Sequence, residues 1–233
     1  MYFLSAIKDG ILSLIFPDIC EVCGQDLVKG EKCICIQCVY SMPVTRYWQY
    51  KDNDVAKIFW GRVEVENACS LFYYRDGSKY RQLIHKLKYK GNYHIGFTLG
   101  EQLGKKLKNS ELYKDIDFII PVPLHKKRLK ERGYNQSEHI ALGISNILKI
   151  PVENNLLIRN KYTETQTRRV RKERLENMIS AFGVKNADKF VGKHILLVDD
   201  IITTGSTIEA CVTVIANNTD CRVSVASLGF ASL

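Results

Sequence analysis

The residues best suited to chemistry in this chain lie at positions 194–207. Four apolar residues run directly into two adjacent acids, Asp199 and Asp200, and two more apolar residues lead into a turn of Thr, Gly and Ser. Beyond the turn, apolar residues recur at helical spacing, and Ser206 and Glu209 have the spacing of a capping box. The pattern predicts a buried strand, a polar loop at its carboxyl end and a helix N-terminus, where backbone N–H groups can bind phosphate.

This stretch resembles the phosphoribosyl-pyrophosphate (PRPP) motif of type I phosphoribosyltransferases. The resemblance makes Asp199 and Asp200 the catalytic pair, which binds the two ribose hydroxyls with Mg²⁺ nearby. The 5′-phosphate would lie in the loop formed by Thr203, Thr204, Gly205, Ser206 and Thr207. One alternative is an ordinary buried strand that ends in two solvated acids. Another is the Walker B strand of a nucleoside triphosphatase, which is disfavoured because the sequence contains no G-x-x-x-x-G-K-[ST] motif.

A second chemically active group is a cysteine cluster near the start of the chain. Cys20 and Cys23 form one C-x-x-C knuckle, and Cys35 and Cys38 form another after eleven intervening residues. Four thiolates in paired knuckles are typical of a closed structural site, so we expect them to hold Zn²⁺. Cys33 is a spare thiol that could replace Cys35 only at wider spacing. The alternatives are a disulfide pair, which conflicts with a cytoplasmic location, and a redox motif, which explains one knuckle but not two.

Positive charge is concentrated in short runs of this chain, whose net charge is +9. The first run occupies positions 126–132, the second occupies 168–174, and a looser third occupies 81–90. Such runs favour polyanions such as pyrophosphate or nucleic acid, although most charge runs are simply solvated helix faces. Tyr89, Tyr93 and Tyr134 add rings that could stack on bases. The first run, which we assign to pyrophosphate or nucleic acid, comprises Lys126, Lys127, Arg128, Lys130 and Arg132.

The elements that must position these groups alternate between strand and helix. Strand patterns cover 68–74 and 117–122, and a helical pattern covers 78–88. A basic loop at 125–132 precedes a further helix, for which Asn135 and Glu138 make a second capping box. This alternation predicts a parallel α/β sheet flanked by helices, the architecture of a type I phosphoribosyltransferase.

Composition and length define the remaining expectations. A hydrophobic content of 45% and a charged content of 25% are ordinary for a soluble globular protein. No apolar run approaches the ~20 residues that a transmembrane helix needs, and no signal peptide is evident. We therefore expect a cytoplasmic protein with a short amphipathic helix over positions 4–15. Its predicted parts are a double zinc ribbon-like module over 1–45, a connecting segment over 46–75 and a phosphoribosyltransferase-like domain over 76–233.

Several further segments resemble ComF-family proteins. Lys88 to Gly91 match the K-Y-[KR]-G stretch of that family. The proline-rich loop and the R-G-[FY]-N-Q element are matched by Pro121-Val122-Pro123, Arg128, Arg132-Gly133 and Asn135-Gln136. The R-x₃-T-x₂-Q and R-x₂-N-x₃-A-F segments are matched by Arg159, Thr163, Gln166, Arg174, Asn177 and Ala181-Phe182. The resemblance implies a cytoplasmic role in natural transformation, in which the protein handles incoming single-stranded DNA with a helicase-like competence partner.

Two classes of function are therefore open. In an enzyme, a nucleophile would displace pyrophosphate from Mg²⁺-bound PRPP, and Lys127, Arg128 and Arg132 would stabilise the leaving group. Such an enzyme could serve nucleotide metabolism or salvage without any link to DNA. Thr203 stands where purine-salvage enzymes carry a carboxylate, which disfavours that chemistry. In a binding module, the zinc-stabilised chain would hold single-stranded DNA on its basic face and keep the PRPP site as a sensor or scaffold.

Overall fold

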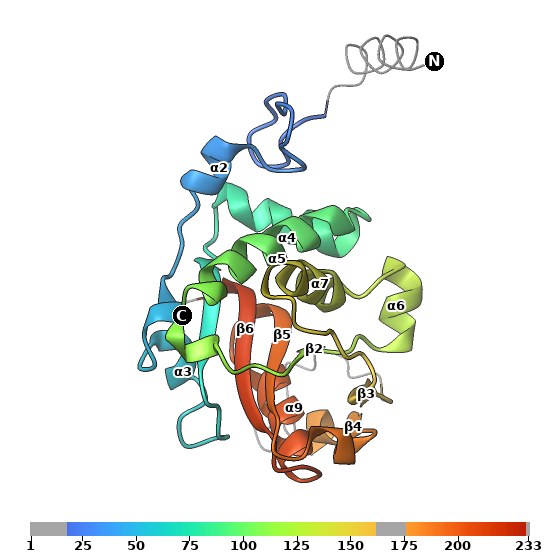
Figure 1. The fold of residues 1–233 in the computed structure, drawn as a ribbon. Helices are drawn as coiled ribbons and strands as arrows, with labels where there is room; N and C mark the ends of the chain where they lie inside the picture. The colour runs from blue at the N-terminus through green and yellow to red at the C-terminus, as the bar shows by residue number, and fades with distance from the viewer. Residues whose placement is uncertain (1–17, 162–175, 232–233) are drawn as a thin grey trace, which may run out of the picture.

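The computed structural model describes residues 18–161 and 176–231 and is built around a parallel sheet (Figure 1). The sheet has four strands in the order β1-β6-β5-β2, and each neighbouring pair is parallel. These strands are β1 (Ala68–Tyr73), β2 (Phe118–Pro121), β5 (His194–Ile202) and β6 (Arg222–Phe230). A separate antiparallel pair consists of β3 (Leu157–Arg159) and β4 (Phe182–Val184). The predicted parallel α/β class is confirmed.

Helices cover both faces of the sheet, which explains the continuous apolar run of β5. One face packs against α4 (Lys79–Tyr89), α5 (Tyr93–Lys108) and α7 (Gln136–Leu148). The other packs against α3 (Asp54–Lys57) and α9 (Ser206–Ala216). Along β5, Leu196 and Val198 join the first core, whereas Ile195 and Leu197 join the second. The strand alternation therefore divides the apolar residues between two layers.

The N-terminal cysteine region lies against the first helical layer (Figure 1). It contains α2 (Ile36–Tyr40), and the Glu21 carboxylate binds both Lys86 Nζ of α4 at 2.6 Å and Asn92 Nδ2 at 2.7 Å. The remaining short elements are the 3-10 turns η1 (Tyr47–Gln49), η2 (Glu111–Tyr113) and η3 (Ala187–Phe190), together with helix α6 (Lys126–Arg132). The cysteine region is thus fastened to the sheet domain by polar contacts as well as by packing.

Most of the expected elements are present. Strands β1 and β2 lie within the ranges 68–74 and 117–122, and α7 ends before Pro151 as expected. Helix α4 begins after Ser78, whose side chain accepts the Tyr80 N–H, and Gly91 follows its end with φ 71°. These boundaries follow from ordinary capping and turn chemistry.

The expected basic loop at 125–132 is wrong, because residues Lys126–Arg132 form helix α6. His125 Nδ1 accepts the Lys127 N–H at 3.1 Å and caps the first turn. Gly133, with φ 83°, provides the left-handed residue that ends the helix. The intervening Lys, Arg, Leu and Glu are all good helix formers, so local propensity outweighed the polar composition that suggested a loop.

The two capping boxes are also corrected. Helix α9 begins after Gly205, so Ser206 lies in its first turn, and the Glu209 side chain pairs with Arg62. At α7, the Asn135 side chain does accept the Ser137 N–H at 3.2 Å, but Glu138 binds Asn154. The spacing alone could not predict that tertiary partners would take both glutamates.

Some expectations fall on residues whose structure is not described. The amphipathic helix at 4–15 and the basic run at 168–174 lie outside the described residues, as do Thr163, Gln166 and Arg174. Within the described ranges, no helix combines the length and apolar character needed to cross a membrane. The boundaries at 45 and 75 stay a prediction, although β1, from the segment 46–75, is an end strand of the main sheet.

Candidate functional site

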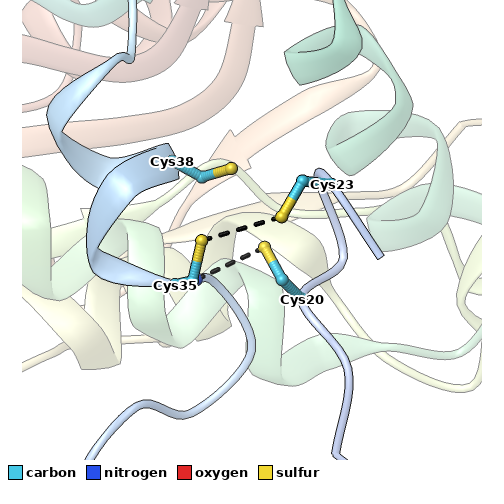
Figure 2. A group of neighbouring side chains, drawn as sticks. All are labelled: Cys20, Cys23, Cys35 and Cys38. Carbon is cyan, nitrogen blue, oxygen red and sulfur yellow. Dashed lines mark hydrogen bonds between the residues drawn. The ribbon is translucent and has the colours of Figure 1, made fainter. Parts of the chain in front are cut away.

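The four knuckle cysteines converge on one point (Figure 2). Their sulfur atoms all lie within 4.8 Å of one another, and the Sγ atoms of Cys23 and Cys35 are 3.7 Å apart. A tetrahedral site with Zn–S bonds of about 2.3 Å requires sulfur separations of about 3.8 Å. Cys20, Cys23, Cys35 and Cys38 could therefore hold a metal ion such as zinc.

The local backbone explains why the sulfur atoms face one another. Gly24 adopts φ 75° after the first knuckle, and helix α2 begins after Cys35 and carries Cys38. The Cys35 N–H points at Cys20 Sγ, 3.3 Å away. Burial alone would raise the pKa of Cys20, but backbone N–H groups that include that of Cys35 lower it to about 6. A thiol that is already a thiolate at neutral pH is a suitable metal ligand.

Cys33 does not belong to this group of four. Its Sγ lies 3.8 Å from the carbonyl oxygen of His94 in α5, and burial raises its pKa. The second knuckle therefore has the tight spacing of Cys35 and Cys38. Cys33 behaves as a buried apolar side chain between the cysteine region and α5.

The adjacent acids lie at the carboxyl half of β5, where three elements meet. Asp199 Oδ1 accepts the hydroxyl of Ser137, in the first turn of α7, at 3.1 Å. The same oxygen accepts the Asp200 N–H at 2.8 Å. Asp200 Oδ1 lies 2.9 Å from Lys88 Nζ, near the end of α4. The acid pair is therefore held by a hydroxyl and an ammonium from two different helices.

Electrostatics at this pair favour a bound cation. Burial, followed by the charge of Asp200, raises the pKa of Asp199 to about 7, although Lys88 and Ser137 act against the shift. An acid in this state is readily ionised by a further positive charge, such as Mg²⁺, placed beside both carboxylates. The donor set of carboxylate oxygens is also the one that Mg²⁺ prefers.

The loop after β5 is held from beneath by residues far away in sequence. Thr203 and Thr204 are exposed, whereas Gly205 is buried with φ 73°. A Cβ at Gly205 would come within 2.5 Å of the Ile58 side chain. Arg62 donates to the carbonyl oxygens of Thr204 and Ile58, each at 2.9 Å, and pairs with Glu209. The loop and the N-terminus of α9 therefore have a fixed backbone, as a phosphate-binding loop requires.

The basic helix α6 follows the carboxyl end of β2, which pairs directly with β5. Lys126, Lys127 and Lys130 are exposed, and Arg128 and Arg132 are half-buried. Arg132 donates to Gln136 Oε1 at 3.0 Å, and its guanidinium lies 5.2 Å from the centre of the Tyr89 ring. The first basic run is thus placed at the same end of the sheet as the acid pair.

The third basic run does not form a uniform cationic face. Arg81 pairs with Asp76 at 2.6 Å, Lys86 pairs with Glu21 at 2.6 Å, and Lys88 pairs with Asp200 at 2.9 Å. In these contacts, nearby acids neutralise much of the positive charge of this run. Its role is therefore more structural than the sequence suggested.

Sequence reasoning missed three residues that shape the site. Lys88 begins the K-Y-[KR]-G stretch and Ser137 directly follows Asn135-Gln136, but nothing in the sequence connected either residue with the acids. No sequence pattern pointed to Arg62 as a site residue, because its contact with Thr204 joins two residues that are 142 positions apart in the chain. Only the fold brings such residues together.

A Ser–His–Asp arrangement whose serine and histidine are buried lies at the other end of β5 and has a structural role. His194 Nδ1 is 2.9 Å from Asp115 Oδ1, and His194 Nε2 is 2.8 Å from Ser224 Oγ. Ser224 and His194 are almost completely buried. The hydroxyl therefore has no access to a substrate, and the two ring nitrogens of His194 are satisfied by Ser224 and Asp115.

Comparison with known proteins agrees with this geometry. Residues 135–229 match the family model described as "Phosphoribosyl transferase domain". The match begins at the cap of α7 and contains β5, its acid pair, the following loop and α9. The parallel sheet, the acid pair and the loop at its end thus define a protein with a type I phosphoribosyltransferase fold.

Individual relatives describe the kind of protein more closely than the family model does. The chain is 37% identical to "Competence protein F" of Haemophilus influenzae over 130 residues, which cover 54% of this chain and 57% of that protein. It is 31% identical to "DNA utilization protein YhgH" of Shigella flexneri, over 61% of this chain and 63% of that protein. It is 27% identical to "Competence protein ComFC" of Bacillus subtilis, over 84% of this chain and 71% of that protein.

Together with the cysteine group, these matches support a ComF-like protein. The matched regions span less than two thirds of the first two relatives. The activity, ligands and partners of this chain are therefore matters for proposal.

Proposed function

We propose that this ComF-like protein binds PRPP or a related phosphorylated ligand together with Mg²⁺, and acts in natural competence by handling incoming single-stranded DNA in the cytoplasm. The observation that carries the proposal is the meeting of the acid pair, Lys88 and Ser137 beside a rigid loop that leads into α9. An ordinary strand that ends in solvated acids would not need partners from two helices.

Each part of a phosphoribosyl ligand has a complementary group in this arrangement. Ribose hydroxyls would donate to the carboxylates of Asp199 and Asp200. The 5′-phosphate would accept backbone N–H groups and hydroxyls over positions 203–207. The pyrophosphate would lie toward the cations of α6, chiefly Lys127, Arg128 and Arg132. When bound, Mg²⁺ would neutralise part of the pyrophosphate charge near the acid pair.

The DNA part of the proposal is supported by charge and by the relatives. Exposed lysines of α6 project from a chain whose net charge is +9. The relatives are named as competence and DNA utilization proteins. The family resemblance further implies a helicase-like partner that would deliver the strand.

A second candidate is an active phosphoribosyltransferase of nucleotide metabolism that has no role in DNA uptake. It is favoured by the retention of both acids at the ligand site. Thr203 has no carboxylate to act as a general base on a purine, so an acceptor would need another means of activation. Turnover of PRPP by the purified protein, with pyrophosphate release, would support this candidate.

The experiment that tests the ligand site compares Asp199→Asn/Asp200→Asn with the wild type in a titration with PRPP and Mg²⁺. We expect the double variant to lose at least a hundredfold in affinity, because both hydroxyl acceptors lose their charge. The matched control is Asp76→Asn/Glu111→Gln, which removes the same charge from two exposed acids. Equal affinities of wild type and Asp199→Asn/Asp200→Asn would contradict the proposal.

A further inference from the structure

Six ring side chains on or next to helices α4, α5 and α7 form two contact groups, one of His85 with Tyr89 and one around Tyr93. Two pairs of rings belong to α4 and α5, and the other two rings lie just before and within α7. Ring centres are 5.0 Å apart for His85 and Tyr89, 4.2 Å for Tyr93 and His94, and 4.7 Å for Tyr93 and His139. We call this group the aromatic surface; it comprises His85, Tyr89, Tyr93, His94, Tyr134 and His139.

The members of the aromatic surface divide into supporting and outward-facing rings. Tyr134 and His139 are half-buried, and the Tyr134 hydroxyl donates to the carbonyl oxygen of Leu87, which ties α7 to α4. Tyr89 is 63% exposed and Tyr93 is 41% exposed. The supporting rings therefore explain helix packing, whereas the two outward tyrosines leave much of their area in solvent.

Positive charge lies beside the Tyr89 ring, and a hollow opens along the same helix. The Arg132 guanidinium lies 5.2 Å from the Tyr89 ring centre, and Lys90 is exposed next to it in sequence. A hollow of about 420 Å³ opens beside α4. Its lining includes the stacked His85 and is otherwise polar or charged, with Gln82, Lys86, Lys90, Asn92 and Glu21.

Exposed rings flanked by cations are what a protein needs to bind a single strand without reading its sequence. Each base offers a face for stacking, and the backbone phosphates are attracted by nearby lysine and arginine side chains. The positive charge beside the rings is complementary to a phosphate backbone, which a protein partner lacks. Charge complementarity therefore favours a nucleic acid strand as the occupant.

We propose that Tyr89 and Tyr93, with Arg132 beside Tyr89, form the surface on which this protein stacks the bases of single-stranded DNA. The proposal rests on the DNA-handling part of the proposed function and specifies where the strand lies. Lys88, the residue next to Tyr89, pairs with Asp200. The DNA strand would therefore lie alongside the proposed phosphoribosyl site rather than inside it.

The test uses the full chain and a fluorescent 20-nucleotide oligo(dT), with anisotropy as the readout at low salt. We expect Tyr89→Leu/Tyr93→Leu to bind at least fivefold more weakly, because base–aromatic stacking contributes about that factor or more per base. Tyr89→Phe/Tyr93→Phe should bind like the wild type, because both rings remain. The matched control is Tyr50→Leu, since Tyr50 is also exposed, at 57%, in another part of the molecule.

An abasic oligonucleotide of the same length separates stacking from charge. The wild type should bind it more weakly than oligo(dT), and the Leu double variant should bind the two alike. Melting curves and PRPP titration check that each variant is folded, and Tyr89→Leu alone is the fallback if the double variant unfolds. Unchanged oligo(dT) affinity in the Leu variants would overturn the aromatic surface while leaving DNA binding intact. A wild type that binds no DNA would overturn both this surface and the DNA role, whereas PRPP titration reports separately on the phosphoribosyl site.

Discussion

The two sites of this protein are built in opposite ways. The cysteine site takes all four groups from positions 20–38, and two short knuckles determine its shape. The proposed phosphoribosyl site gathers groups from α4, α7, β5 and the segment around Arg62. The first is local and closed, because four protein ligands leave no position for a substrate. The second is open and requires the sheet to be formed first.

This difference predicts how the fold and the ligand affinity respond when each site loses one of its residues. A local metal site and the fold of its small module are coupled, so a lost ligand should damage both together. A site assembled from distant elements can lose its ligand affinity while the fold persists, because no single short segment depends on the bound ligand for its folding. The predictions below test this contrast, beginning with the largest expected effect.

The largest effect should come from the cysteine site. We expect the wild type to contain about one zinc ion per chain, and Cys38→Ser to lose the metal and destabilise the N-terminal region. Apparent binding free energies of structural zinc sites are about 10–16 kcal/mol in zinc-finger peptides, so the loss should be severe. Elemental analysis and melting curves provide the measurement, and Cys33→Ser is the control because Cys33 lies outside the group. Metal-free wild type, or an unchanged melting curve in Cys38→Ser, would contradict the zinc site.

Arg62 should give the next largest effect. Its side chain and that of Glu209 are only 17% and 8% exposed, so Arg62→Met leaves a buried carboxylate without its partner. We expect a loss of about 3–5 kcal/mol in the free energy of unfolding, measured with urea. Adding Glu209→Gln should recover part of the loss, because the unpaired charge is then absent. Additive losses in the double variant would show that the two side chains do not act as a pair.

The raised pKa of Asp199 gives a smaller and pH-dependent effect. Its pKa is about 7 in the folded protein, against about 3.9 in an unfolded chain. Between these values the folded state binds more protons, so this group lowers stability as pH rises from about 4 to 7. Asp199→Asn does not titrate, and its stability relative to the wild type should rise by about 2–3 kcal/mol between pH 5 and pH 7.5.

Urea unfolding at both pH values, without Mg²⁺ or ligand, measures this change. Asp76→Asn is the control, because Asp76 is an exposed acid that pairs with Arg81. A stability difference between Asp199→Asn and the wild type that is equal at the two pH values would show that Asp199 is not perturbed in the folded protein.

The smallest effect concerns the exposed cations of α6. If these side chains contact a DNA backbone, the affinity for oligo(dT) should fall with salt by about 0.7 decades per decade for each phosphate contact. Replacing Lys126, Lys127 and Lys130 by Gln should reduce that slope by about two. The control is Lys105→Gln/Lys106→Gln/Lys108→Gln in α5, which removes the same charge elsewhere. An unchanged slope in the α6 variant would place the DNA on another surface.

The sequence was informative where chemistry is local. Three short patterns can each be recognised without knowledge of the fold: two C-x-x-C knuckles, an apolar run followed by two acids, and a Gly/Ser/Thr turn. The fold class and the cysteine group could therefore be predicted. Helix α6 was missed because capping by His125 and termination at Gly133 outweighed a composition typical of a loop. Glu209 was assigned to a capping box because its partner, Arg62, comes from a segment that the sequence suggested only as a connection.

The central claim is that the distributed site is a working ligand site, and direct titration of the wild-type protein with PRPP tests it. Calorimetry should show about one PRPP bound per chain when Mg²⁺ is present, and much weaker binding when Mg²⁺ is removed. This result is expected because the acid pair needs a cation to meet a ligand that is itself highly anionic. No binding at millimolar PRPP with Mg²⁺, by a protein that retains its zinc and its fold, would contradict the account.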